Sequence, residues 1–94
     1  MKVIFKKEGD SVVAFFPELP GTSDPFTCAC YAHIGQHSSA SVLYAATLRP
    51  ARGFETLALT AELVRIGYTD LKTASKFTSK DAIARRRAIK ESSK

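Results

Sequence analysis

KVIFKKEGDSVVAFF, residues 2–16, is the stretch that decides the fold. Two runs of β-branched and aromatic residues flank Glu8-Gly9-Asp10, a pattern typical of two antiparallel strands joined by a tight turn. The next stretch, PELPGTSDP (residues 17–25), contains three prolines and a glycine, so the chain must leave the sheet there. The sequence therefore predicts a β-hairpin followed by an irregular loop.

A third strand is expected to begin near Phe26 and to run through the cysteine- and histidine-rich stretch CACYAHIGQH, residues 28–37. Side chains alternate between the two faces of a strand. One face then carries only apolar side chains, those of Phe26, Cys28, Cys30, Ala32 and Ile34. The opposite face carries Thr27, Ala29, Tyr31 and His33, and we expect Tyr31 and His33 to point outward, toward a turn formed by Gly35, Gln36 and His37.

The rest of the chain predicts one main helix and one further strand. SASVLYAATL, residues 39–48, fits either a helix or an extended segment. Residues 54–66 repeat apolar side chains at helical spacing, and Gly67 stands where a C-terminal cap belongs. YTDLKTASKF, residues 68–77, is interpreted as a fourth strand. The stripe predicted to face the core consists of Phe54, Leu57, Ala58, Ala61 and Val64, and it is widened by Leu59, Leu63 and Ile66.

Charge is distributed unevenly along the chain. Positive and negative side chains are equal in number in residues 1–75, so the whole net charge of +5 lies in residues 76–94. Thr78-Ser79-Lys80-Asp81 fits a capping box that opens a short basic helix. We therefore expect an α+β domain over residues 1–75, with a mostly antiparallel sheet in the order strand, strand, strand, helix, strand, and a basic helix or tail over residues 76–94.

Composition limits the class of protein. With 94 residues, the chain predicts a single small domain. Its longest apolar runs fall far short of the roughly 20 residues that cross a bilayer, so we expect no contact with a membrane. The two cysteines are separated by one residue and make a poor disulfide pair. Reduced thiols and a cytoplasmic location are expected.

A zinc site would need ligands of the types found in Cys28, Cys30, His33 and His37, but the spacing of these residues does not fit one. Structural zinc sites take cysteines two to four residues apart from turns, whereas a strand points both cysteines into the core. An apolar face would also raise the pKa of a cysteine thiol and leave it a poor nucleophile. We therefore expect no metal, no cofactor and no catalytic residue. A small enzyme or metal protein centred on His33 and His37 stays an alternative.

Two surfaces remain as candidate sites. The first could bind a protein, a small ligand or a nucleotide by stacking and hydrogen bonding, and it consists of Tyr31, His33, Gly35, Gln36 and His37. The alternative is that the two histidines only stabilise their own loop. The basic segment could contact nucleic-acid phosphates or an acidic protein, or be only solvated. Edge strands of the hairpin could also pair two copies as a homodimer. The basic residues of the candidate nucleic-acid contact are Lys80, Arg85, Arg86, Arg87 and Lys90.

Two stretches resemble known families. SVVAFFPELPG, residues 11–21, resembles the second strand and turn of the HicB antitoxins. That resemblance implies the same order of elements, a small RNA-cleaving toxin as partner and a C-terminal DNA-binding segment. YAHIGQH (residues 31–37), with IGYTDL at residues 66–71, resembles a group of short uncharacterised proteins of phages and other mobile elements, which implies no established activity.

From the sequence we expect a small non-enzymatic binding protein of a phage or other mobile element. Its contact surface would lie around residues 31–37, and its basic tail would bind nucleic acid. A HicB-like antitoxin or regulator is the alternative that the first resemblance implies.

Overall fold

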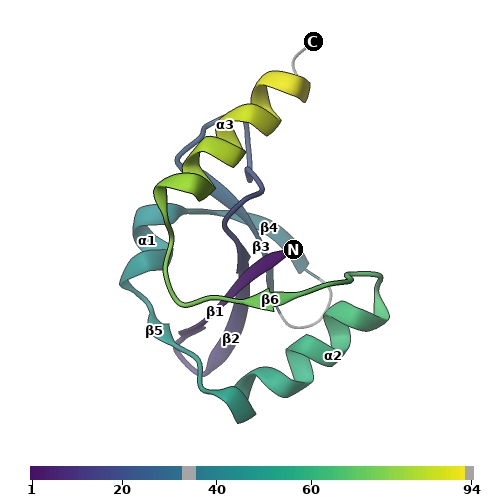
Figure 1. The fold of residues 1–94 in the computed structure, drawn as a ribbon. Helices are drawn as coiled ribbons and strands as arrows, with labels where there is room; N and C mark the ends of the chain where they lie inside the picture. Colours follow the sequence, from purple (N-terminus) through teal and green to yellow (C-terminus); the bar gives the residue numbers. More distant parts are fainter. Residues whose placement is uncertain (33–35, 93–94) are drawn as a thin grey trace.

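The computed structural model describes residues 1–32 and 36–92, and its centre is an open, mostly antiparallel sheet (Figure 1). The strands β1 (Lys2–Glu8), β2 (Ser11–Phe16), β3 (Thr27–Ala32) and β4 (Gln36–Ser41) are neighbours in chain order. On the other edge of β1, β5 (Arg49–Pro50) pairs antiparallel and β6 (Lys72–Thr73) pairs parallel. The predicted α+β class is confirmed.

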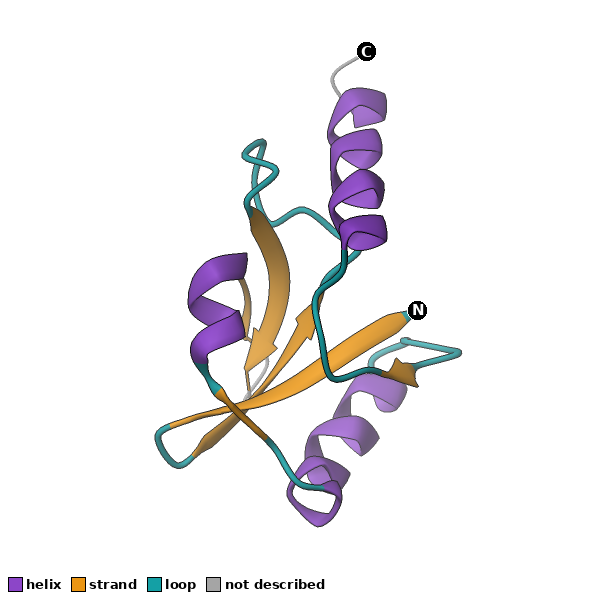
Figure 2. Ribbon diagram, turned by 60° about the vertical axis from the view of Figure 1, so that its left-hand side comes forward, coloured by secondary structure: helices purple, strands orange, loops and turns teal. Residues whose placement is uncertain are grey.

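Helical segments surround this sheet. The short helix α1 (Val42–Thr47) lies on one side, and the 3₁₀ turn η1 (Gly53–Thr56) continues into α2 (Leu57–Arg65) on the other side. The last helix, α3 (Ser79–Ser92), projects beyond the sheet (Figure 2). Within the described residues, no helix is long and apolar enough to cross a membrane.

The first two strands form the expected hairpin. Ile4 pairs with Phe15 and Glu8 pairs with Ser11, with Gly9 at φ +60° in the turn. Glycine adopts a positive φ without the steric penalty that a Cβ would bring. This hairpin is the interior of the sheet, because β2 also pairs with β3 and β1 also pairs with β5 and β6. The prediction that hairpin edges could pair two copies is therefore wrong.

Both faces of the sheet are buried, whereas the sequence predicts one apolar face with outward-pointing side chains opposite. Alternation along β1, β2 and β3 supplies two separate apolar sets. One set packs against α2, and the other packs against α1 and the segment after β6. The α2-side core contains Val3, Phe5, Ala14, Phe16, Tyr31, Leu59 and Leu63, and the α1-side core contains Ile4, Val13, Phe15, Cys28, Cys30 and Ala45.

Several local predictions differ from the structure. Gln36 and His37 begin strand β4 instead of forming a turn, and β4 pairs with β3 along its whole length. Its sequence, QHSSAS, lacks the β-branched and aromatic residues that mark strands, so tertiary pairing decides its conformation. Phe26, expected in the core, is exposed. The ambiguous stretch, residues 39–48, divides between the end of β4 and helix α1, and the predicted fourth strand is reduced to the two residues of β6.

Helix α2 stands at the predicted place but in a different orientation. Leu59 and Leu63 are its buried residues and face the sheet. The stripe predicted for the core, Phe54, Leu57, Ala58, Ala61 and Val64, is exposed. The cap is confirmed, because Gly67 has φ +116° and the backbone N–H of Tyr68 donates to the carbonyl of Leu63 at 3.0 Å.

The loop between β2 and β3 packs tightly against the sheet at Gly21. A Cβ placed on Gly21 would lie 2.3 Å from the Cβ of Ser39 and 2.7 Å from the carbonyl oxygen of Cys28. Those atoms belong to two paired strands, so relief would require the loop to move away. Gly53, in contrast, has no atom within 4 Å of such a Cβ.

We therefore expect Gly21→Ala to lower the free energy of unfolding by about 2 kcal/mol, the usual cost of overpacking. Chemical denaturation of the purified chain measures this effect. Gly53→Ala is the matched control and should change stability by less than about 0.5 kcal/mol. Equal stability of the two variants would contradict the close packing of the loop.

Candidate functional site

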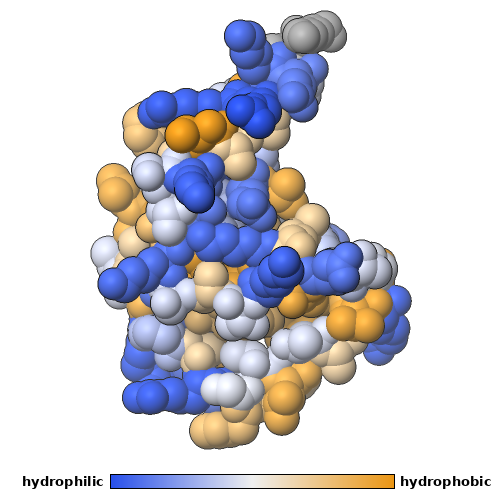
Figure 3. Space-filling view, in the orientation of Figure 1, coloured by the Kyte–Doolittle hydropathy of each residue, from blue (hydrophilic) through white to orange (hydrophobic). Residues whose placement is uncertain are grey.

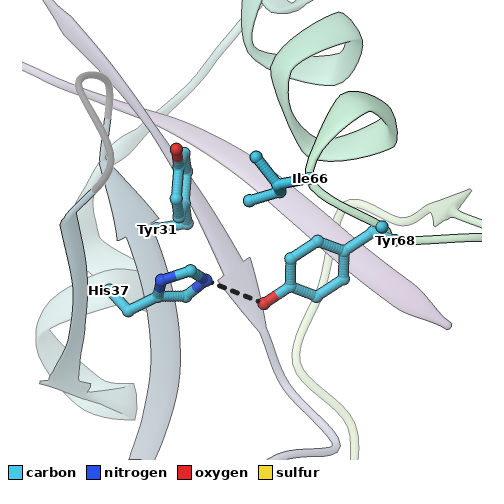
Figure 4. Close-up of a pocket in the computed structure, with 5 residues that line it drawn as sticks. Tyr31, His37, Ile66 and Tyr68 are labelled. Atoms are coloured by element: carbon cyan, nitrogen blue, oxygen red, sulfur yellow. Dashed lines mark hydrogen bonds between the residues drawn. The ribbon is translucent and has the colours of Figure 1, made fainter.

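An open hollow lies between the sheet and the end of α2 (Figure 4). It has a volume of about 440 Å³. Tyr31 comes from β3, His37 comes from the start of β4, and Ile66, Gly67 and Tyr68 follow α2. We call these five residues the aromatic hollow. The segments that the sequence analysis singled out for their resemblance to phage proteins thus meet at one place.

Ring contacts hold the hollow together. His37 and Tyr31 are directly paired across β3 and β4, and their ring centroids are 4.7 Å apart in an edge-to-face arrangement. The Nε2 atom of His37 lies 3.1 Å from the hydroxyl oxygen of Tyr68, within hydrogen-bond distance. Tyr68 in turn stacks on Phe16, with centroids 4.9 Å apart. The polar groups at the rim are therefore fixed by packing beneath them.

Tyr31 is buried, whereas the sequence predicts that its side chain points outward. Only 1% of its surface is exposed, because α2 covers the sheet face that it occupies. Its hydroxyl donates a hydrogen bond of 3.0 Å to Glu62 of α2. Tyr31 therefore forms part of the wall of the hollow and cannot extend outward as a free contact residue. His33 and Gly35 lie outside the described residues, and of Gln36 the structure describes the backbone pairing with Ala32.

Sequence reasoning missed Ile66 and Tyr68 as site residues. The sequence pattern assigns Ile66 to the core stripe at the end of the predicted helix and Tyr68 to a strand. The signal available was the glycine between them, because a C-terminal cap reverses the chain and returns the next residue toward the sheet.

The cysteines lie on the opposite face of the sheet from the hollow. Burial raises the pKa of the Cys28 thiol to about 11, and the nearby Cys30 adds to this effect. The Sγ atom of Cys30 is 3.1 Å from the hydroxyl oxygen of Ser38. The prediction that alternation sends both cysteines into the core is confirmed. Across residues 1–32 and 36–92, no group of three or more potential metal ligands converges.

The basic segment is a helix fixed to the sheet at its first turn. Thr78 and Asp81 form the predicted capping box, in which the backbone N–H of Thr78 donates to Asp81 at 2.8 Å and that of Asp81 donates to the Thr78 hydroxyl at 3.3 Å. Asp81 also pairs with the ammonium of Lys2 at 2.8 Å. Burial raises the pKa of Asp81, but the hydrogen bonds from Lys2 and Thr78 outweigh burial and hold that pKa below its usual value.

Arg85 fixes the next turn of α3 and is not available as a surface contact. Its guanidinium donates from Nη1 to the carbonyl oxygen of Pro17 at 2.7 Å and from Nε to that of Pro25 at 2.9 Å. Only 4% of Arg85 is exposed. Its predicted role in a nucleic-acid contact is therefore corrected to an internal one, which holds α3 against the loop between β2 and β3.

The remaining basic residues of α3 share its outer side. Positions 80, 83, 87 and 90 follow the spacing of one helix face, opposite Asp81 and Arg85. The space-filling view shows a largely hydrophilic surface over this helix (Figure 3). The outer basic face consists of Lys80, Arg86, Arg87 and Lys90, all exposed, around the exposed Ile83.

Comparison of the chain with protein-family models, with curated proteins and with solved structures found no match.

We expect Asp81→Asn to lower the free energy of unfolding by about 1–3 kcal/mol at neutral pH, because it weakens both the helix cap and the pair with Lys2. The pKa of Asp81 is lowered by folding, so its stabilisation is present above the unfolded-state pKa of about 3.9 and is lost as the pH falls further. Denaturation of both chains between pH 7 and pH 3 measures the difference.

Asp10→Asn, in the exposed hairpin turn, is the control and should leave stability within about 0.5 kcal/mol. A difference between wild type and Asp81→Asn that stays constant down to pH 3 would show that the Asp81 carboxylate does not stabilise the fold.

Proposed function

We propose that the protein is a small non-enzymatic binding protein that contacts single-stranded nucleic acid. The observation that carries this proposal is that the two sides of α3 differ in what their charged side chains contact. Asp81 and Arg85 bind inward to the domain, while the outer basic face points to solvent. The cations are thereby presented to solvent by a helix held against the domain, and lysine and arginine are the side chains that neutralise nucleic-acid phosphates.

The aromatic hollow favours single-stranded over double-stranded nucleic acid as the ligand. Proteins that bind single strands combine a cationic surface with aromatic side chains on which an unstacked base can lie. The rim of the hollow offers the imidazole of His37 and the hydroxyl of Tyr68 beside apolar ring surface. We assign the phosphate contact to α3 and the contact with a base to the hollow.

Two further parts of the proposal concern where the protein acts. Cys28 and Cys30 are both free and buried, which suits the reducing conditions of the cytoplasm. The resemblance of residues 31–37 and 66–71 to short phage proteins supports an origin in a phage or another mobile element. A HicB-like antitoxin is the rival, and it would bind a toxin protein in preference to nucleic acid.

We expect the chain to bind a short fluorescent single-stranded RNA or DNA, with an affinity that falls steeply as salt rises. Arg86→Gln with Arg87→Gln should weaken binding and make the slope of log affinity against log salt shallower by about 0.7 for each phosphate that is no longer neutralised. The matched control is Arg49→Gln with Lys72→Gln, which removes the same charge from exposed strand positions. Fluorescence anisotropy across a salt series measures both.

Equal weakening in the two double variants would show that net charge, and not the outer face of α3, governs binding. Absence of binding by the wild-type chain at low salt would contradict the proposed function.

Substitution of His37 tests the hollow separately. We expect His37→Ala to weaken binding of the same strand by about 10-fold, in line with the removal of one stacked base, and to leave the salt dependence unchanged. Tyr44→Ala removes an exposed ring from α1 and is the control. If His37→Ala binds as tightly as the control variant, the hollow does not hold a base.

A further inference from the structure

The outer side of η1 and α2 is apolar and uncovered. Phe54, Leu57 and Val64 are 79%, 67% and 59% exposed, and Ala58 and Ala61 between them are also exposed. Hydrophobic side chains gather along this lower edge of the molecule (Figure 3). Single exposed apolar residues are ordinary, but a continuous row on one helix is typical of an interface.

The row has the spacing of a helix-packing seam. Phe54, Leu57, Ala61 and Val64 are separated by three, four and three residues, as are the a and d positions of a heptad repeat. We call these four residues the outer seam. Leu59 and Leu63, which face the sheet, lie on the other side of the same helix. Helix α2 is therefore apolar on two sides, and the domain itself buries one of them.

The size of the row matches the apolar part of a dimer interface. A standard interface covers about 800 Å² on each partner, of which roughly 60% is apolar. Phe54 alone exposes on the order of 150 Å², given the 150–250 Å² of an aromatic side chain. The whole row, with both alanines, offers on the order of 400 Å², which approaches that requirement.

We propose that the outer seam is the interface of a homodimer, in which α2 of one copy packs antiparallel against α2 of a second copy. The bulky residues Phe54 and Leu57 stand at one end of the row, and the smaller Val64 stands at the other, with alanines between. An antiparallel arrangement places each bulky end against the smaller end of the partner, and the alanines allow close approach at the centre.

A cation at one end of the row favours the same arrangement. Arg65, whose side chain is 75% exposed, stands at the C-terminal end of α2. Antiparallel packing brings each arginine toward the other copy's Phe54, whose ring attracts a guanidinium. The carboxylate of Glu55 binds Lys7 and the backbone N–H of Arg52 in its own copy, so a second copy fits this surface through the shape and the apolar area of the row. This inference does not rest on the proposed function.

Sedimentation equilibrium of the full chain tests the dimer. We expect twice the mass of one chain at concentrations on the order of 100 µM, because interfaces of standard size have dissociation constants that are micromolar or lower. Leu57→Glu should raise the dissociation constant at least about 30-fold, because it places a carboxylate against the apolar side chains of the partner copy. A glutamate in the first turn suits the helix dipole, so the fold should persist.

Leu43→Glu is a closely matched control. Leu43 is 76% exposed and also lies in the first turn of a helix, α1. It should leave the dimer intact. Circular dichroism verifies the fold of each variant, and Ala61→Lys replaces Leu57→Glu if the latter does not fold. A monomeric wild-type chain, or a folded seam variant that dimerises as tightly as the wild type, would overturn the proposal.

Discussion

The rest of the structure depends on a sheet whose two faces are both apolar. Strands β1, β2 and β3 send alternate side chains into two separate cores. Such a sheet must be covered on each side, because neither face can remain in water. Helix α2 covers one face, and α1 with Phe77 covers the other. Alternation along β3 then places Cys28 and Cys30 in one core and Tyr31 in the other.

Much of this was predictable from local pattern. The hairpin, the Gly67 cap, the capping box at Thr78 and the burial of the cysteines follow from turn chemistry, glycine conformation and strand alternation. The remainder depends on tertiary contacts. Strand β4 is a strand because β3 pairs with it, and its own side chains give no sign of that. Periodicity also cannot say which of two apolar sides of α2 faces the sheet.

In the candidate site, too, some features follow from the local sequence and others depend on tertiary contacts. His37 is identifiable from its residue type, but its neighbour Tyr68 is thirty-one residues away in sequence, and their proximity depends on the turn after α2. In the basic segment, composition cannot distinguish Arg85 from Arg86 and Arg87. Burial does so, because the carbonyl oxygens of Pro17 and Pro25 accept only the guanidinium that faces them. The loop that leaves the sheet at Pro17 thus holds the helix that carries the charge.

The sheet face that packs against α1 carries both cysteines, so their reactivity tests most directly whether that face is sealed from water. A soluble disulfide reagent that releases a coloured thiolate reports each free thiol as it reacts. We predict that neither Cys28 nor Cys30 reacts in the native chain, because both are buried and the pKa of Cys28 is about 11, and that both react once denaturant unfolds the sheet. Rapid reaction of either thiol without denaturant would show that water reaches this face of the sheet.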